Sequence, residues 1–330
     1  TYVACASFFN GSAKFNFGQK PFEYAPPQGF LPLNSANTTP VNVIPRPDQY
    51  VGVKTWSGTA ATHSITGLNF NAKPDLVWLK ERSSTSDHGL WNSVMGQSEY
   101  NSSNSTQGHW DTTTEFTSFD YNGFTLGNNT MTNQSGQSYV AWCWKAGGSK
   151  GVFNVDDVGY ASAAAAGLTG GDITPIGASV GTKQGFSIIK FTTDSGASGG
   201  DTLPHGLNAQ PAMYIYKPTS TSGEWVVVHK ANYDQFAYLN ATTQFRSISS
   251  QGGGTPADPT NSVLSLYDLG VALASKTYIC YAWSDVPGLQ KFGQFTGNSD
   301  ADGVYVELGF KPAILLIKND NSTGDWIIWD

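Results

Sequence analysis

The sequence has few charges, few cysteines and no long apolar run, and each shortage excludes a class of protein. Charged residues make up 13% of the 330 positions, the net charge is −7, and lysine and arginine form no cluster. Nothing in such a chain would neutralise a row of phosphates, so neither nucleic acid nor an anionic membrane surface is an expected partner. The apolar runs are far shorter than the ~20 residues of a membrane-spanning helix, so we expect no membrane insertion.

A helical repeat of apolar residues is also missing. No stretch carries apolar residues at i, i+3, i+4 and i+7 over three turns. The one helix-friendly segment, Ala161 to Leu168, is short and is followed by glycines, which favours a linker or a single helical turn. Glycine, serine, threonine, asparagine and aromatic residues are plentiful instead. This composition is typical of short strands joined by polar turns and predicts an all-β protein.

The three cysteines, Cys5, Cys143 and Cys280, are far apart and form no C-x-x-C pair. Their spacing argues against a disulfide framework and against a zinc site. The chain is long enough for two or three domains. Because it starts at Thr1 without a signal-peptide pattern and ends at Asp330 inside an apparent strand, we expect it to be a piece of a longer protein.

A strand module recurs along the chain. The sequences KPDLVWLK at 73–80, QPAMYIYK at 210–217 and KPAILLIK at 311–318 each place a proline six positions before a lysine. Proline is tolerated at the first residue of a strand, and lysine can lay its stem along a sheet and lift its amine to water. A polar loop and a tryptophan follow in each copy, namely Trp91, Trp225 and Trp326. The unit is therefore a buried strand, a polar turn and a tryptophan-bearing strand.

A second block occurs twice, as YVAWCW at 139–144 and YICYAW at 278–283. A period of two places the bulky residues on one face and the small residues on the other. Alanine and cysteine exchange places between the copies, which keeps the volume of the small face constant, as tight packing requires. We therefore interpret Cys143 and Cys280 as packed core residues rather than reactive thiols.

The repeats predict the domain organisation. Lead-in strands that end in an aromatic residue are expected at 53–56, 186–191 and 291–295. The predicted divisions are the C-terminal part of an earlier domain at 1–39, a first β module at 40–148, a Gly/Ala-rich connection at 149–184, a second β module at 185–286, and the start of a truncated third module at 287–330.

The segment from Phe15 to Leu33, FNFGQKPFEYAPPQGFLPL, resembles the closing part of the SPRY-like domains of bacteriophage tail and virion proteins. The modules after it resemble repeats that follow such domains in marine bacteriophages, especially those infecting cyanobacteria. The matching motifs are Pro74 to Lys80, Trp91, Phe124 to Gly127, Tyr139 to Trp144 and Lys291 to Gly297.

This resemblance covers nearly the whole chain, and its motifs are structural. It implies tandem concanavalin-like or jelly-roll antiparallel β-sandwich modules and a location in the virion, and it transfers no catalytic residue. The second module departs from the pattern, because Leu264-Ser265-Leu266 stands where Phe-x-Leu-Gly is expected.

A search for reactive groups finds no catalytic pattern. The glutamates are isolated from the paired arrangement that a retaining glycosidase needs, and no histidines stand at metal-binding spacing. The stretch NSDADG at 298–303 could offer oxygens to calcium, but it lacks a later glutamate and resembles a hairpin turn more closely. We therefore expect no enzyme activity, no metal and no cofactor.

The polar stretch from Gln97 to Asp111 is the candidate binding region. It carries Tyr100, His109 and Trp110 among amide and hydroxyl side chains, a combination that suits a sugar, whose hydroxyls pair with polar groups and whose apolar face covers a ring. The alternative is that Trp110 pins the loop onto its own sandwich, the more common use of a large aromatic residue.

These observations predict a virion protein of fibre or decoration type that attaches to host-surface polysaccharide. A structural assembly or adaptor component without a ligand is the first alternative, and a polysaccharide-degrading tail enzyme is the second. The resemblance also suggests contacts with other virion proteins and a homo-oligomer, with a trimer as the guess, since phage fibres are often trimers.

Overall fold

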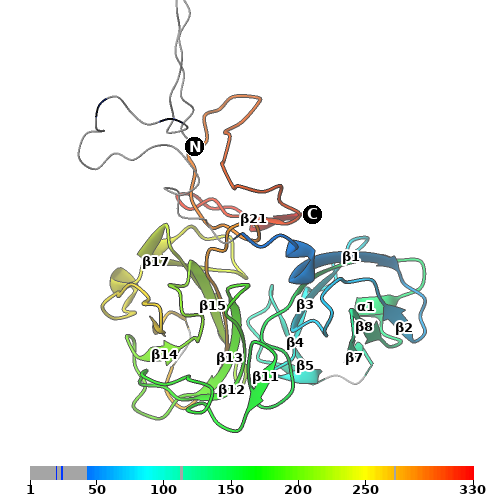
Figure 1. Cartoon of the computed structure of the whole chain (residues 1–330), viewed down its shortest axis with the longest axis horizontal. Coiled ribbons are helices and arrows are strands. Elements are labelled where there is room, and N and C mark those ends of the chain that lie inside the picture. Colours follow the sequence, from blue (N-terminus) through cyan, green and yellow to red (C-terminus); the bar gives the residue numbers. More distant parts are fainter. Residues whose placement is uncertain (1–19, 21–23, 25–42, 112–113, 271–272) are drawn as a thin grey trace, which may run out of the picture. The chain divides into compact units, whose positions relative to one another are not determined.

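The computed structural model describes Lys20, Tyr24 and residues 43–111, 114–270 and 273–330. The chain forms two units, Thr1–Asn42 and Val43–Asp330, and the second is described below. Apart from Lys20 and Tyr24, the predicted SPRY-like segment at 1–39, with Cys5, lies outside the described residues. The described fold is all-β, as predicted, with one short α-helix, α1 (Thr130–Asn133), and strands arranged in antiparallel sandwiches (Figure 1).

The first module is a sandwich of two sheets. The larger sheet has the order β1 (Val51–Ser57), β9 (Ser138–Trp144), β3 (Leu76–Glu81), β4 (Gly89–Asn92), β5 (Gly96–Ser102) and β6 (Trp110–Asp111). The smaller sheet has the order β2 (His63–Ile65), β8 (Gly123–Leu126) and β7 (Phe116–Asp120). A core of aromatic and aliphatic side chains, the first inner core, fills the space between them.

The second module repeats this plan with a larger sheet. Its order is β11 (Val158–Tyr160), β10 (Phe153–Val155), β12 (Pro175–Gly181), β13 (Phe186–Thr192), β20 (Thr277–Trp283), β15 (Met213–Pro218), β16 (Val226–His229), β17 (Asn232–Tyr238) and β18 (Arg246–Ser247). Only β10 and β12 run parallel among the described pairs. A two-stranded antiparallel sheet of β14 (Thr202–Pro204) and β19 (Val263–Ser265) packs against the second inner core through Leu203 and Leu264.

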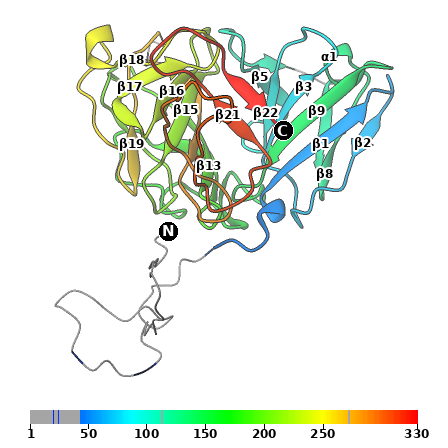
Figure 2. The same ribbon diagram turned by 90° about the horizontal axis from the view of Figure 1, so that it is seen from above.

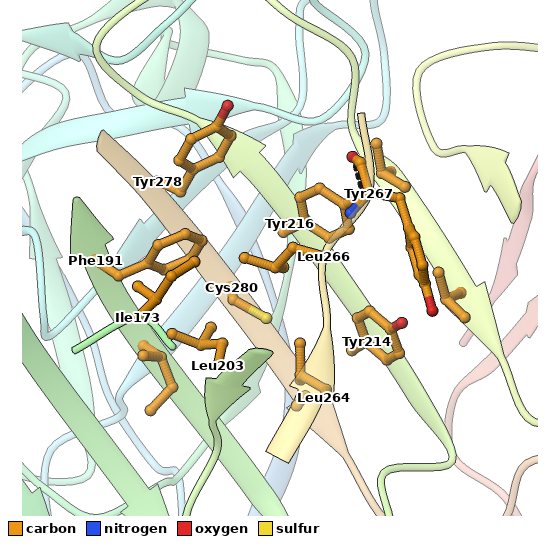
Figure 3. Packing of buried hydrophobic residues seen from close by; sticks show 14 of the residues in the cluster. Ile173, Phe191, Leu203, Tyr214, Tyr216, Leu264, Leu266, Tyr267, Tyr278 and Cys280 are labelled. Atoms are coloured by element: carbon orange, nitrogen blue, oxygen red, sulfur yellow. Dashed lines mark hydrogen bonds between the residues drawn. The ribbon is translucent and has the colours of Figure 1, made fainter. Parts of the chain in front are cut away.

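Figure 3 shows the packing of the second inner core, whose two β15 tyrosines are hydrogen-bonded through their hydroxyls. Tyr214 and Tyr216 point from β15 into the core, and their hydroxyls donate to the carbonyls of Ser265 and Tyr267 at 2.9 and 2.8 Å. The Tyr216 hydroxyl also accepts from the Tyr267 amide at 3.0 Å. Paired hydroxyls of this kind remove the cost of burying a polar group. The stretch at 264–266 that departs from the repeat pattern therefore serves as the hydrogen-bonding partner of β15.

Two expectations about local structure differ from the result. The segment 149–184, expected to be a connection, contains the strands β10, β11 and β12. Ala178 and Val180 of β12 pack into the second inner core, so a strand with modest apolar side chains can still be part of the sandwich. The lead-in segment at 291–295 forms no strand, whereas β1 and β13 do. Since Val43–Asp330 is one compact unit, the module boundaries themselves remain predictions.

The alternation in the repeated block is confirmed. Cys143 and Cys280 are fully buried in the first and second inner cores, on the small faces of β9 and β20. The bulky faces point the other way, into a core that both modules share. The buried members of this shared core are Leu76, Trp78, Leu90, Met95, Val140, Trp142, Ala146, Phe186, Ile188, Met213, Ile215, Trp225, Val227, Leu239, Ile279, Tyr281 and Trp283.

The third copy contributes a hairpin of β21 (Leu315–Ile317) and β22 (Ile327–Trp329). Figure 2 shows this hairpin between the strands of the first module and those of the second. Ile314, Leu316, Trp326 and Ile328 pack against the shared core. All three copies therefore turn the same face of the Pro-to-Lys strand toward one common centre.

Successive copies also contact each other through the same hydrogen bonds. The Lys217 amine donates to the carbonyl of Thr106 at 3.1 Å, and the Lys318 amine donates to that of Thr242 at 3.2 Å. The same two carbonyls also accept the amides of Gly223 and Gly324, at 2.7 and 2.8 Å. The indole of Trp225 donates to the carbonyl of Ser102, and the indole of Trp326 donates to that of Tyr238, both at 2.9 Å. One geometry thus relates the second copy to the first and the third to the second.

The tryptophans of the three copies are not all equivalent. Strand pairing places Gly89, Val226 and Ile327 opposite the residue before each repeated lysine. Trp225 and Trp326 therefore precede the paired positions and face the shared core, whereas Trp91 follows and faces the first inner core. An odd offset along a strand reverses the face of a side chain, and the position of Trp91 corresponds to that of Trp329.

Candidate functional site

The predicted binding region forms a hairpin. Strands β5 and β6 pair with Glu99 opposite Asp111 and Tyr100 opposite Trp110. The loop between them is held at its base by Asn104, whose side chain accepts from the His88 amide at 3.0 Å and donates to Asp87 at 2.7 Å. The hairpin is thus a fixed part of the first module.

The second module holds the tip of the same hairpin. Both the amine of Lys217 and the amide of Gly223 donate to the carbonyl of Thr106, and the amide of His109 donates to the carbonyl of Thr219 at 2.9 Å. Burial lowers the pKa of Lys217 to about 8. A loop that two modules hold in place presents its side chains in one geometry, which reduces the entropy cost of binding.

One face of the hairpin is aromatic. Residues directly opposite in an antiparallel pair share a face, so Tyr100 and Trp110 lie side by side. Tyr100 is half-buried and stacks on Trp91 at 4.7 Å between ring centroids, and burial, followed by the charges of Glu115 and Asp87, raises the pKa of Tyr100 to about 12. Trp110 is 44% exposed. The indole is therefore available to a ligand.

The other face of the hairpin carries charge. His109, Glu99 and Asp111 bring their ligand atoms within 4.8 Å of one another. The Nδ1 atom of His109 lies 2.9 Å from the Thr219 carbonyl, which only accepts, so Nδ1 carries the hydrogen and Nε2 faces Asp111 at 3.6 Å. The Lys190 amine, from β13 of the second module, lies 3.7 Å from Glu99.

The structure thus places the three predicted site residues in one hairpin but on two faces. Tyr100 and Trp110 share the aromatic face, and His109 lies on the charged face. Sequence reasoning missed Glu99 and Asp111 as neighbours, although the polar turn between two short alternating segments is a signal of a hairpin. Lys190 carries no such signal, because it reaches the site from another module.

The charged face can accept hydrogen bonds or hold a cation. In the part of the chain that the structure describes, Glu99, His109 and Asp111 are the one group of three side chains with metal-ligand geometry. Asp111 is 88% exposed on its side chain, so a cation there would keep much of its water.

The other expected turn is shaped by its own side chains. In the segment 298–303, the Asn298 side chain donates to the Gly303 carbonyl at 2.8 Å, and the carboxylate of Asp300 accepts the Asp302 amide at 3.0 Å. Gly303 has a φ of 72°, which favours glycine. These bonds account for the Asp- and Asn-rich sequence as a turn.

A surface pocket lies beside the start of the hairpin. It has a volume of about 290 Å³, and its lining includes Gly96 and Gln97 at the start of β5. Its remaining lining is mostly polar, with Lys73, Ser93, Thr117, Ser118, Phe119 and Ser149. Hydroxyl, amide and amine groups with a single ring offer hydrogen bonds to a polar ligand rather than an apolar pocket.

The geometry defines a tandem β-sandwich protein with an exposed aromatic and acidic hairpin at the junction of its modules. The chain belongs to the family described as a domain of unknown function, DUF7483, whose model matches residues 46–330. No curated protein and no solved structure matches the chain. None of the helices in the described ranges is long and apolar enough to cross a membrane.

Proposed function

We propose that this chain is a non-catalytic structural protein of a bacteriophage virion, of fibre or decoration type, and that its β5–β6 hairpin attaches to host-surface polysaccharide. The observation that carries the binding part is the 44% exposed indole of Trp110 on a hairpin fixed by two modules. The virion part rests on the repeated modules and on the resemblance of residues 15–33 and of the repeats to phage proteins.

The chemistry of the hairpin suits a carbohydrate. The face of an indole covers the apolar face of a sugar ring, and carboxylate and imidazole groups accept hydrogen bonds from hydroxyls. Glu99, Asp111 and His109 supply such acceptors at the same hairpin. Because the aromatic and charged groups lie on opposite faces, the proposed ligand is a polymer that wraps around the hairpin edge rather than a single sugar in a pocket.

The proposal is tested by binding of the full chain to a glycan array and to polysaccharide extracted from cyanobacterial cell envelopes. Trp110→Ala should weaken binding about fivefold or more. Tyr121→Ala is the matched control, since Tyr121 is 66% exposed on the same module and lies outside the hairpin. Equal binding by both variants would show that the hairpin is not the attachment site.

Two alternatives have observable consequences in the same experiment. A polysaccharide-degrading enzyme is favoured by the proximity of Glu99 and Asp111, and it would release reducing ends that Glu99→Gln prevents. A purely structural component would bind no glycan. Contacts with other virion proteins and a trimeric state are part of the proposal, and light scattering of the intact protein measures the latter.

A further inference from the structure

The hairpin of the third copy exposes a face that the other copies bury. Leu315 is 39% exposed, Ile327 47% and Trp329 64%. The positions that correspond to Leu315 are Val77 and Tyr214, and both are fully buried in the inner cores of their modules. The position that corresponds to Trp329 in the first module is Trp91, which is also fully buried. The corresponding positions are thus apolar in all three copies, but they are buried in the two complete modules and exposed in the third copy.

The exposure does not arise from a displaced hairpin. The opposite face of β21 and β22 packs on the shared core through Ile314, Leu316, Trp326 and Ile328. The hydrogen bonds of Lys318, Gly324 and Trp326 to the second module reproduce those of the second copy to the first. The third copy therefore occupies the position that the repeat geometry assigns to it.

Two irregularities of the third copy concern the same position in the sheet order. In both complete modules the Tyr-to-Trp strand lies between the lead-in strand and the Pro-to-Lys strand, in the orders β1-β9-β3 and β13-β20-β15. Among the residues that the structure describes, β21 pairs with β22 alone, and the lead-in segment at 291–295 forms no strand. Both segments would gain a partner from one strand inserted between them.

We propose that this gap is a binding site for one further β-strand of the Tyr-to-Trp type. The strand adds antiparallel to the free edge of β21, through main-chain hydrogen bonds, as extended segments add to exposed sheet edges. Its chemistry follows from β9 and β20: tyrosine and two small residues alternate on the same face of the sheet as Leu315 and Ile317, and bulky apolar residues face the shared core.

The register of the added strand follows from the two existing pairs. Trp144 lies opposite Leu76, and Trp283 lies opposite Met213, so the final tryptophan of the added strand lies opposite Ile314. Val140 and Ile279 lie opposite the repeated lysines, so a β-branched residue lies opposite Lys318. A slip of one residue would exchange the small and bulky faces, which makes the site selective for sequence pattern.

A labelled peptide tests the site directly. The peptide carries the sequence of Thr277–Trp283 with alanine in place of Cys280 and flanking lysines for solubility, and anisotropy follows its binding to the full chain. We expect saturable binding at one peptide per chain. Leu315→Asp should weaken it about tenfold or more, because a carboxylate would lie against the small face of the strand. Val158→Asp is the control, since Val158 is exposed on β11, and it should bind unchanged.

A second peptide with the same composition, shifted by one residue so that its faces exchange, should bind at least about tenfold more weakly. Equal affinity for the two peptides, equal affinity of the Leu315→Asp chain, or no binding up to the solubility limit would overturn the proposal. Dimers that form through β21 and are not displaced by the peptide would also overturn it, because a second copy would then be the occupant.

Discussion

Acidification is expected to destabilise the second module through His205. The imidazole is fully buried after β14, its Nδ1 accepts the Leu207 amide at 3.2 Å, and its Nε2 donates to the Thr260 carbonyl at 3.3 Å. Only the neutral ring with hydrogen on Nε2 makes both bonds. Burial lowers the pKa of His205 to about 4, partly offset by the bond to Thr260, whereas the unfolded chain titrates near 6.5.

Because the folded pKa lies below the unfolded one, the unfolded chain takes up the proton first as the pH falls. The contribution of His205 to stability is therefore complete above about pH 6.5 and is lost as the pH falls toward 4. A difference of about 2.5 pKa units corresponds to about 3 kcal/mol in full, and to about 1.4 kcal/mol at pH 5.5. Because the His205 contribution is lost gradually, unfolding should be measured between pH 7.5 and pH 5.

Urea unfolding followed by tryptophan fluorescence at pH 7.5 and pH 5.5 measures this loss. His205→Gln, which keeps an amide donor for Thr260, should be less stable at pH 7.5 but should lose about 1.4 kcal/mol less on acidification than the native chain. His88 and His229 also have pKa values lowered by burial, so some slope will remain in the variant. Identical pH slopes for the two chains would refute the assignment.

Three further outcomes follow from the buried groups. Cys143 and Cys280 should not react with a thiol reagent until the chain unfolds, because burial raises the pKa of both thiols; rapid labelling of either of these two residues in a native Cys5→Ser chain would contradict this. Asp75→Ala should cost about 3 kcal/mol in urea unfolding, since the buried carboxylate accepts from two backbone amides and two serine hydroxyls; a cost below about 1 kcal/mol would show that water replaces it. Trp225→Phe should cost about 1 kcal/mol through the lost bond to the first module, and an unchanged midpoint would argue against that contact.

The repeat allowed much of the fold to be predicted. The alternation in the blocks at 139–144 and 278–283 set which faces of β9 and β20 are small, because period two is dictated by strand geometry alone. The alternation could not show that the bulky faces of different copies meet in one core, since that contact depends on how the modules pack against each other. The sequence also could not show that Trp91 and Trp225 occupy different positions of the module and face different cores, because strand register, not residue identity, decides the face.

The candidate site was predicted in part for the same reason. Tyr100, His109 and Trp110 could be found as an aromatic and polar group within one loop. Their division between two faces depends on the pairing of Tyr100 with Trp110. The carbonyl of Thr219 that orients His109 lies in the second module, and no local pattern indicates a contact across so long a stretch of sequence.

The most direct test of the central claim is the affinity of the full chain for purified host-envelope polysaccharide, compared between Trp110→Ala and Tyr121→Ala. Removal of an aromatic side chain that stacks on a nucleobase costs about 1–3 kcal/mol. On the same scale, loss of the indole should weaken polysaccharide binding by about fivefold to 150-fold, while the Tyr121 variant should bind as the native chain does. Binding that is equal in the two variants, or absent from the native chain, would contradict the proposed attachment role.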